Sequence, residues 1–142
     1  MVVLKTISVM SRKAEEFINI TDEVHETVES SGVKSGLAAI ITSHTTTGIF
    51  VNEGLPCVET DIADTFTRLV PLEAPYAHAH FLPSYGATGN NSTGHIKSLL
   101  CGNNCIFPVS DGKMVCGGAQ DIYLAEFDGP QKRTIFIQVI GE

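Results

Sequence analysis

The 142-residue chain is 43% hydrophobic and 18% charged, a length and composition that predict one folded domain, residues 1–142, with a buried core. Its formal net charge is −7 and its basic residues are adjacent only in two pairs, Arg12-Lys13 and Lys132-Arg133, so we expect no nucleic-acid partner, because neutralising phosphates needs a face of Lys and Arg. No apolar run approaches the roughly 20 residues that span a bilayer, and no signal-peptide pattern opens the chain, so we expect a cytoplasmic protein without a membrane partner.

The first third of the chain predicts two strands, a helix and a further strand. Residues 2–9 are rich in β-branched side chains and predict a strand, with residues 17–20 as its short antiparallel partner. Thr21 is a suitable N-cap for a helix that we expect to end at Gly32. The continuous apolar run in residues 36–43 predicts a strand that is buried on both faces.

The middle of the chain predicts two helices around a long loop. Residues 49–51 resume extended structure, and a second helix begins at Pro56 and ends before Pro71. Its apolar residues recur at three- and four-residue spacing, at Val58, Ile62, Phe66 and Leu69. Residues 71–94 are loop-like, and a loop of this length is usually functional or disordered. Residues 95–100 predict a third, short helix, whose cap is Asn91, Ser92 or Thr93.

The last third of the chain is predicted to be mostly strand. Residues 106–109 and 114–115 form a hairpin around a turn at residues 111–112. Residues 122–127 and 134–140 supply the final strands. About eight strands with two or three helices predict an α+β fold with an antiparallel, β-sandwich-like core.

His44 heads a run of three threonines and Gly48, a hydroxyl-rich turn whose backbone amides suit an anion such as phosphate. Asn52 and Glu53 bring an amide and a carboxylate close behind. A histidine at the end of a strand more often only hydrogen-bonds a backbone carbonyl. The sequence leaves both a structural and a functional role open for His44.

A second group of histidines follows in the long loop and at the third helix. His78 and His80 would share one face if the segment were extended, where they would suit a metal; the alternative is a solvated loop with one useful histidine. His95 begins the helix, where the helix dipole and free amides favour a bound anion. Lys97 and Ser98 add a cation and a hydroxyl, which fits a phosphorylated ligand.

Other polar residues carry weaker signals. Asp61 and Asp64 share one face of the second helix, which turns toward the histidines or toward water. Taken singly, Gln120, Glu126 and Asp128 are more often structural than catalytic. The four cysteines are expected to be reduced thiols and not metal ligands.

These motifs occur together in one order along nearly the whole chain. They are His44-Thr45-Thr46, Asn52-Glu53, Asp61, Tyr76-x-His78, Asn91-x-x-x-His95-x-Lys97-Ser98, Gly102, Pro108-Val109, Asp111-Gly112, Gly118-x-Gln120 and Glu126-Phe127-Asp128-Gly129-Pro130. In this set and order the chain closely resembles the YjbQ-like family, the proteins called secondary thiamine-phosphate synthases. Chance does not produce so many ordered matches.

The resemblance implies an α+β, sandwich-like subunit, a homotrimer, and a divalent metal, zinc or magnesium, held by histidines near a subunit interface. It also implies a weak transferase activity that joins a pyrimidine pyrophosphate to a thiazole phosphate. The metal ligands expected from it are His44, His78 and His95, with His80 as the alternative to His78. The expected catalytic residues are His44, Asn52, Glu53, Asp61 and His95, and the expected substrate-binding residues are Thr45, Thr46, Lys97, Ser98, Gln120, Glu126 and Asp128.

The chain departs from the family pattern at three positions. Ala119 stands where the family usually has tryptophan, Gln131 replaces an arginine, and Asn104 replaces a serine. The loss of an aromatic face and of a fixed guanidinium changes how a base or a phosphate is held. Two other functions therefore stay open: a non-catalytic binding protein for a phosphorylated metabolite, and a hydrolase that uses metal-bound water.

Overall fold

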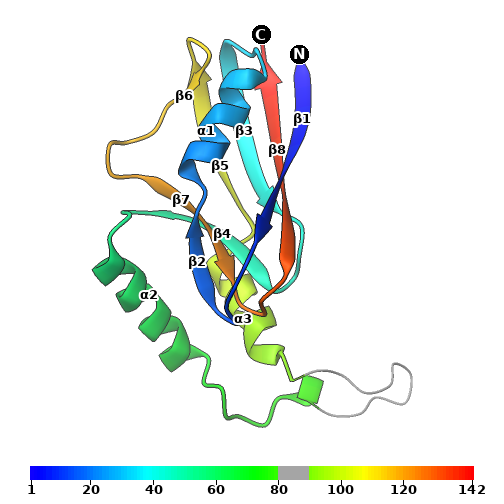
Figure 1. The fold of residues 1–142 in the computed structure, drawn as a ribbon, viewed down its shortest axis with the longest axis vertical. Helices are drawn as coiled ribbons and strands as arrows, with labels where there is room; N and C mark the ends of the chain where they lie inside the picture. Colours follow the sequence, from blue (N-terminus) through cyan, green and yellow to red (C-terminus); the bar gives the residue numbers. More distant parts are fainter. Residues whose placement is uncertain (80–89) are drawn as a thin grey trace, which may run out of the picture.

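The computed structural model describes residues 1–79 and 90–142. These residues form two antiparallel sheets that face each other, with one helix beside the smaller sheet and two helices toward one end (Figure 1). The predicted α+β fold is confirmed. No helix in the described ranges is long and apolar enough to cross a membrane.

The larger sheet has five strands in the order β1-β8-β3-β5-β6. Their bounds are β1 Val2–Met10, β8 Lys132–Gly141, β3 Ser35–Thr42, β5 Asn104–Ser110 and β6 Lys113–Met114. The expectation that β3 is buried on both faces is wrong. Ala38 and Ile40 are fully buried, whereas Leu37 on the other face is 53% exposed. An antiparallel sheet with one covered face buries only alternate residues, and here the outer residues are apolar as well.

The smaller sheet has three strands in the order β2-β7-β4, with bounds β2 Glu16–Asn19, β7 Asp121–Glu126 and β4 Thr47–Asn52. The expected pairing of the first two strands is wrong, because β2 pairs with β7 and β1 pairs with β8 along its whole length. A four-residue strand would leave most backbone groups of β1 without partners, whereas the ten-residue β8 satisfies them. The core lies between the sheets, and β7 is buried almost throughout.

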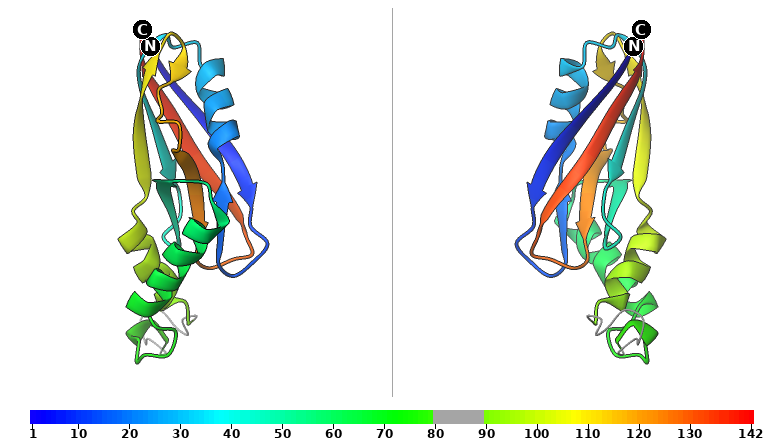
Figure 2. Two further views of the ribbon diagram at one scale, coloured as in Figure 1. Left: turned by 90° about the vertical axis from the view of Figure 1, so that its left-hand side faces the viewer. Right: turned by 90° about the vertical axis from the view of Figure 1, so that its right-hand side faces the viewer.

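Helix α1 (Thr21–Ser30) lies on the same side of the larger sheet as the smaller sheet does (Figure 2). It buries Val24 and Val28 in the core. The predicted cap is displaced by one residue, because the N-cap position belongs to Ile20 and Thr21 is the first helical residue. The Thr21 hydroxyl instead contacts Asn19 and Asp121 in the neighbouring strands, which ties the start of the helix to the sheet.

Helix α2 (Pro56–Leu69) begins and ends as the sequence predicts, but none of its residues is fully buried. The described part of the following loop contains a short 3-10 turn, η1 (Ala77–Ala79). Helix α3 (Ser92–Cys101) begins three residues earlier than predicted, with Asn91 at its N-cap position. In Figure 1, α3 lies at the end of the sheets opposite both chain termini.

Candidate functional site

A pocket of about 620 Å³ lies at the end of the sandwich where α3 meets the turn after β3. Its volume is within the range of small-molecule sites. Two chain segments line it: Thr42, Ser43, His44 and Thr45 come from β3 and the turn, and His95, Ser98, Leu99, Gly102 and Asn103 come from α3 and the residues that follow. No aspartate or glutamate is among these lining residues, although the chain carries a net charge of −7.

Hydroxyl groups hold the turn between β3 and β4 in place. The hydroxyls of Thr42 and Thr47 lie 2.6 Å apart, and the Thr47 hydroxyl also donates to the His44 carbonyl at 3.1 Å. The Ser98 hydroxyl donates to the Thr47 carbonyl at 2.5 Å and so fixes α3 against the start of β4. Together these bonds define the two walls of the pocket.

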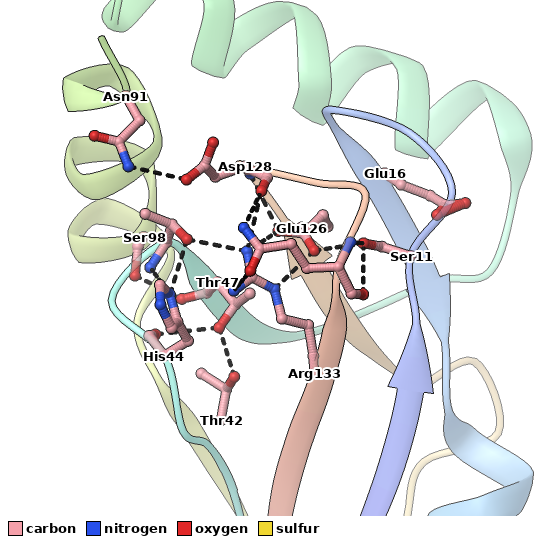
Figure 3. A network of polar contacts seen from close by, with 12 residues as sticks. Ser11, Glu16, Thr42, His44, Thr47, Asn91, Ser98, Glu126, Asp128 and Arg133 are labelled. Carbon is pink, nitrogen blue, oxygen red and sulfur yellow. Dashed lines mark hydrogen bonds and ion pairs between the residues drawn. The ribbon is translucent and has the colours of Figure 1, made fainter. Parts of the chain in front are cut away.

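The His44 ring is oriented by Thr46. Its Nδ1 accepts the Thr46 backbone N–H at 3.1 Å and lies 2.9 Å from the Thr46 hydroxyl, and Arg133 Nη2 donates to that same hydroxyl at 3.0 Å (Figure 3). Burial lowers the pKa of His44 most, and the positive charge of Arg133 and the neighbouring His95 lower it further. Asp128 and Glu126 raise this pKa by less, so the neutral ring is favoured near pH 7.

Behind this turn lies a buried ion pair between Glu126 and Arg133. Arg133 Nε donates to Glu126 Oε1 at 2.8 Å, and its Nη2 lies 2.5 Å from Oε2. Ser11 Oγ and the Asp128 backbone N–H also donate to this carboxylate, at 2.6 and 3.1 Å. Burial raises the pKa of Glu126, but the hydrogen bonds from Arg133, Ser11 and Asp128 outweigh it and hold the pKa below its ordinary value. Glu126 is fully buried and does not line the pocket.

Two other predicted substrate-binding residues also have protein partners. Lys97 is 4% exposed, and its ammonium group lies 2.5 Å from Glu15 Oε1 on the side of α3 that does not line the pocket. Asp128 accepts a hydrogen bond of 2.9 Å from Asn91 Nδ2, which links the turn after β7 to the start of α3. Lys97 and Asp128 therefore hold the walls of the site and do not line it.

The remaining predicted residues lie elsewhere on the chain. Asn52 is the last residue of β4 and Glu53 follows it, at the end of a strand that spans roughly 17 Å from its start at Thr47. Asp61 is exposed on α2. Gln120 precedes β7, and its side chain accepts the Gly117 backbone N–H at 2.8 Å. A single chain does not bring these four residues into the pocket.

Of the three predicted metal ligands, two lie side by side. The rings of His78 and His95 are 5.2 Å apart between centroids, at an angle of 80°. His44 fits a ligand role poorly, because its Nδ1 already accepts hydrogen bonds from Thr46. Across residues 1–79 and 90–142, no three His, Cys, Asp or Glu side chains are grouped so as to hold a metal ion. His80 lies outside the described residues, and metal binding stays a prediction.

Sequence reasoning missed Arg133 and Asn103. Arg133 is 3% exposed and occupies an inward position of β8, so the alternation of that strand already indicated a buried cation. Asn103 lines the pocket beyond the end of α3, and nothing in the residues around it identified it.

Burial raises the pKa of the nearby Cys101 to about 11, so this thiol stays protonated at neutral pH.

Comparison with known proteins identifies relatives of one family, by sequence and by structure. Residues 5–142 match the family model described as UPF0047 protein YjbQ-like. A UPF0047 protein of Methanocaldococcus jannaschii is 35% identical, with 100% of this chain and 99% of the relative covered. The UPF0047 protein YugU of Bacillus subtilis is 36% identical, with 97% and 99% covered. A solved YbjQ-like protein of unknown function from Sulfolobus solfataricus P2 has a TM-score of 0.91 at 31% identity, with 100% and 99% covered.

Proposed function

Because the chain belongs to the YjbQ-like UPF0047 family, we propose that its pocket binds a phosphorylated metabolite and that the protein is a weak thiamine-phosphate synthase-type transferase. One observation carries the proposal: among the described residues, those that line the pocket supply hydroxyl, amide and imidazole groups and no carboxylate. Arg133 does not line the pocket, but it donates a hydrogen bond to Thr46, the residue that follows the lining residue Thr45. In a chain with a net charge of −7, such a lining favours an anionic ligand.

The proposed reaction joins two phosphorylated rings. The bond between the pyrimidine methylene carbon and the pyrophosphate oxygen breaks, and pyrophosphate leaves with the electron pair. The benzyl-like cation that remains is attacked by the thiazole nitrogen, which forms the new carbon–nitrogen bond. Hydrogen-bond donors aimed at the departing pyrophosphate stabilise the charge that develops on it. A divalent metal, which the family resemblance implies, would supply further positive charge, and no step here depends on it.

We also propose that the active unit is a homotrimer in which neighbouring copies complete one another's sites. Asn52, Glu53, Asp61 and Gln120 belong to the motifs that carry the family resemblance but lie outside the pocket of their own chain. If a second copy of the chain presented these four residues to the pocket, they would belong to the site although they lie outside the pocket of their own chain. In the closed symmetry of a homo-oligomer, each site would receive the same set.

Incubation with the two substrates tests the proposed activity. Purified full-length protein is mixed with pyrimidine pyrophosphate and thiazole phosphate, with Mg²⁺ or Zn²⁺ added, and thiamine phosphate is detected by mass spectrometry. We expect slow product formation that is lost in His95→Asn, since His95 lines the pocket. His25→Asn is the matched control, because His25 lies on α1 beside Cys116.

The same experiment addresses a second candidate, a non-catalytic binding protein. This candidate is favoured by the lack of any carboxylate among the residues that line the pocket of one chain. It predicts that the phosphorylated substrates bind while no thiamine phosphate forms with either metal. Product from wild type and from His95→Asn alike would contradict a transferase at this pocket.

A further inference from the structure

The hydrogen bonds around His44 determine which ring nitrogen carries the proton. Arg133 Nη2 donates to the Thr46 hydroxyl oxygen at 3.0 Å, so the hydroxyl proton is left to point at the other close partner, His44 Nδ1, 2.9 Å away. The Thr46 backbone N–H donates to the same Nδ1 at 3.1 Å. An imidazole nitrogen that accepts two hydrogen bonds is unprotonated, and the proton of the neutral ring is therefore on Nε2.

This arrangement is the reverse of that in a metal-binding histidine. A histidine that binds a metal through Nε2 donates from Nδ1–H to an acceptor, whereas His44 Nδ1 faces two donors. A 180° turn of the ring would place a carbon against the Thr46 backbone N–H and leave that donor without an acceptor. Within the part of the chain that the structure describes, His44 Nε2 has no hydrogen-bond partner.

We propose that His44 donates a hydrogen bond from Nε2–H to an anionic oxygen of a phosphate or pyrophosphate group bound in the pocket, and that it does not ligate a metal. The inference deepens the proposed function and rests on it for the class of ligand. Asn103 adds a second donor to the pocket: its Oδ1 accepts a hydrogen bond from Asn104 at 2.6 Å, which leaves its amide N–H groups to donate. The hydroxyl of Thr45 lines the same wall.

The charges around His44 agree with this role. Arg133 is hydrogen-bonded to Thr46 and is not among the residues that line the pocket. Asp128 and Glu126 are the carboxylates that act on His44, but Glu126 is paired with Arg133 and Asp128 accepts from Asn91. Neither carboxylate lines the pocket. An anion that binds to His44 Nε2 would therefore not be in contact with either of these negative charges.

Two substitutions of His44 separate a donor from a ligand. In His44→Gln the amide nitrogen reaches the place of Nε2, so a donor into the pocket remains. In His44→Asn the amide oxygen takes the place of Nδ1, accepts the Thr46 N–H and keeps the turn, but no donor reaches the pocket. We expect inorganic pyrophosphate, measured by calorimetry in metal-free buffer, to bind His44→Gln within about threefold of wild type and His44→Asn roughly tenfold or more weakly. Circular dichroism checks that both variants are folded.

Three results would overturn the inference. The first is a calorimetric result in which His44→Asn binds pyrophosphate no more weakly than wild type does, whether both bind it equally or neither binds it. The second is a proton on Nδ1 in the ¹⁵N spectrum of the histidine rings near neutral pH, where we expect it on Nε2. The third is loss of Zn²⁺ uptake in both His44→Gln and His44→Asn, since a donor role predicts the wild-type stoichiometry in each variant.

None of these measurements requires turnover. A protein that binds pyrophosphate as expected but forms no thiamine phosphate would therefore reject the transferase and leave the role of His44 intact.

Discussion

Arg133 and Glu126 are two opposite charges removed almost entirely from water, with exposed fractions of 3% and 0%. The carboxylate is satisfied by the guanidinium, a serine hydroxyl and a backbone N–H, and the guanidinium also orients Thr46. A pair buried in this way tolerates the loss of one partner badly, because the other charge is then left unpaired in the core. The pair thus connects the stability of the core to the geometry of the pocket.

Arg133→Met is therefore expected to lower the free energy of unfolding by about 3–5 kcal/mol, measured by urea denaturation. The double variant with Glu126→Gln should lose less than Arg133→Met alone, because no charge remains unpaired. Lys132→Met is the control, since Lys132 is exposed on the same strand, and it should change stability little. Equal stability of Arg133→Met and wild type would show that the pair contributes nothing.

The lowered pKa of Glu126 predicts a dependence of stability on pH. A carboxyl whose pKa in the folded state is below its ordinary value of 4.5 stabilises the fold at higher pH, and this stabilisation is lost as pH falls through the lower, folded-state pKa. The stability advantage of wild type over Glu126→Gln should be full above pH 4.5 and shrink below it. Urea midpoints at a series of pH values measure this, and an advantage that grows toward acid would contradict the assignment.

At the scale of elements, the pocket depends on how closely α3 approaches β4. Gly48 is buried in β4, and a side-chain carbon placed there would lie 2.8 Å from Cys101 Cβ and 2.9 Å from the Gly102 carbonyl oxygen. Real side-chain carbons do not approach other atoms this closely, so any larger residue must push the helix away. The same contact carries the Ser98 bond that closes one wall of the pocket.

Gly48→Ala should therefore destabilise the fold by about 1–3 kcal/mol and weaken binding of inorganic pyrophosphate, because α3 moves relative to the turn. Gly118→Ala is the matched control: a side chain there meets nothing within 4 Å. Thermal unfolding and calorimetry on the two variants give both quantities. Identical behaviour of the two alanine variants would show that the close approach is unimportant.

At the scale of the whole molecule, the outer face of the larger sheet is apolar and exposed. Val2 pairs with Ile140, which also pairs with Leu37, so one row of apolar side chains crosses three strands. The exposed fractions in this row are 64%, 50% and 53%, and Ile106 on β5 is 60% exposed. Contiguous apolar surface of this kind marks an interaction site, and we predict that other copies of the chain cover it.

Light scattering at micromolar concentration should give three times the mass of one chain for wild type. Ile106→Lys should shift this mass toward one chain with an unchanged circular dichroism spectrum, because a charge on the sheet face costs free energy when it is buried. Leu72→Lys is the control, since Leu72 is 69% exposed in the loop after α2. A wild-type protein that is monomeric would defeat the predicted homotrimer, and with it the completion of the pocket by neighbouring copies.

The sequence alone determined those features that depend on neighbouring residues. Apolar spacing between two prolines predicted α2, the pair Asp111 and Gly112 predicted the hairpin, and both residues of that turn have positive φ. The motif order identified the family, and four of its predicted site residues line the pocket: His44, Thr45, His95 and Ser98. Local conformational preferences and short motifs depend on residues that are close together in the chain, so they can be predicted from the sequence alone.

Only the tertiary structure decided which distant groups meet. Glu15 takes up the charge of Lys97 across 82 positions of chain, and Arg133 reaches Thr46 across 87. The pairing of β1 with β8 in place of β2 has the same origin, since it depends on which long strand satisfies the whole backbone edge. Partners so far apart in the chain are selected by burial, strand register and the saturation of hydrogen bonds, which are properties of the packed molecule and of no single segment. For that reason the role that we propose for His44 is argued from its contacts with Thr46 and Arg133 in the fold, whereas the sequence alone left the role open.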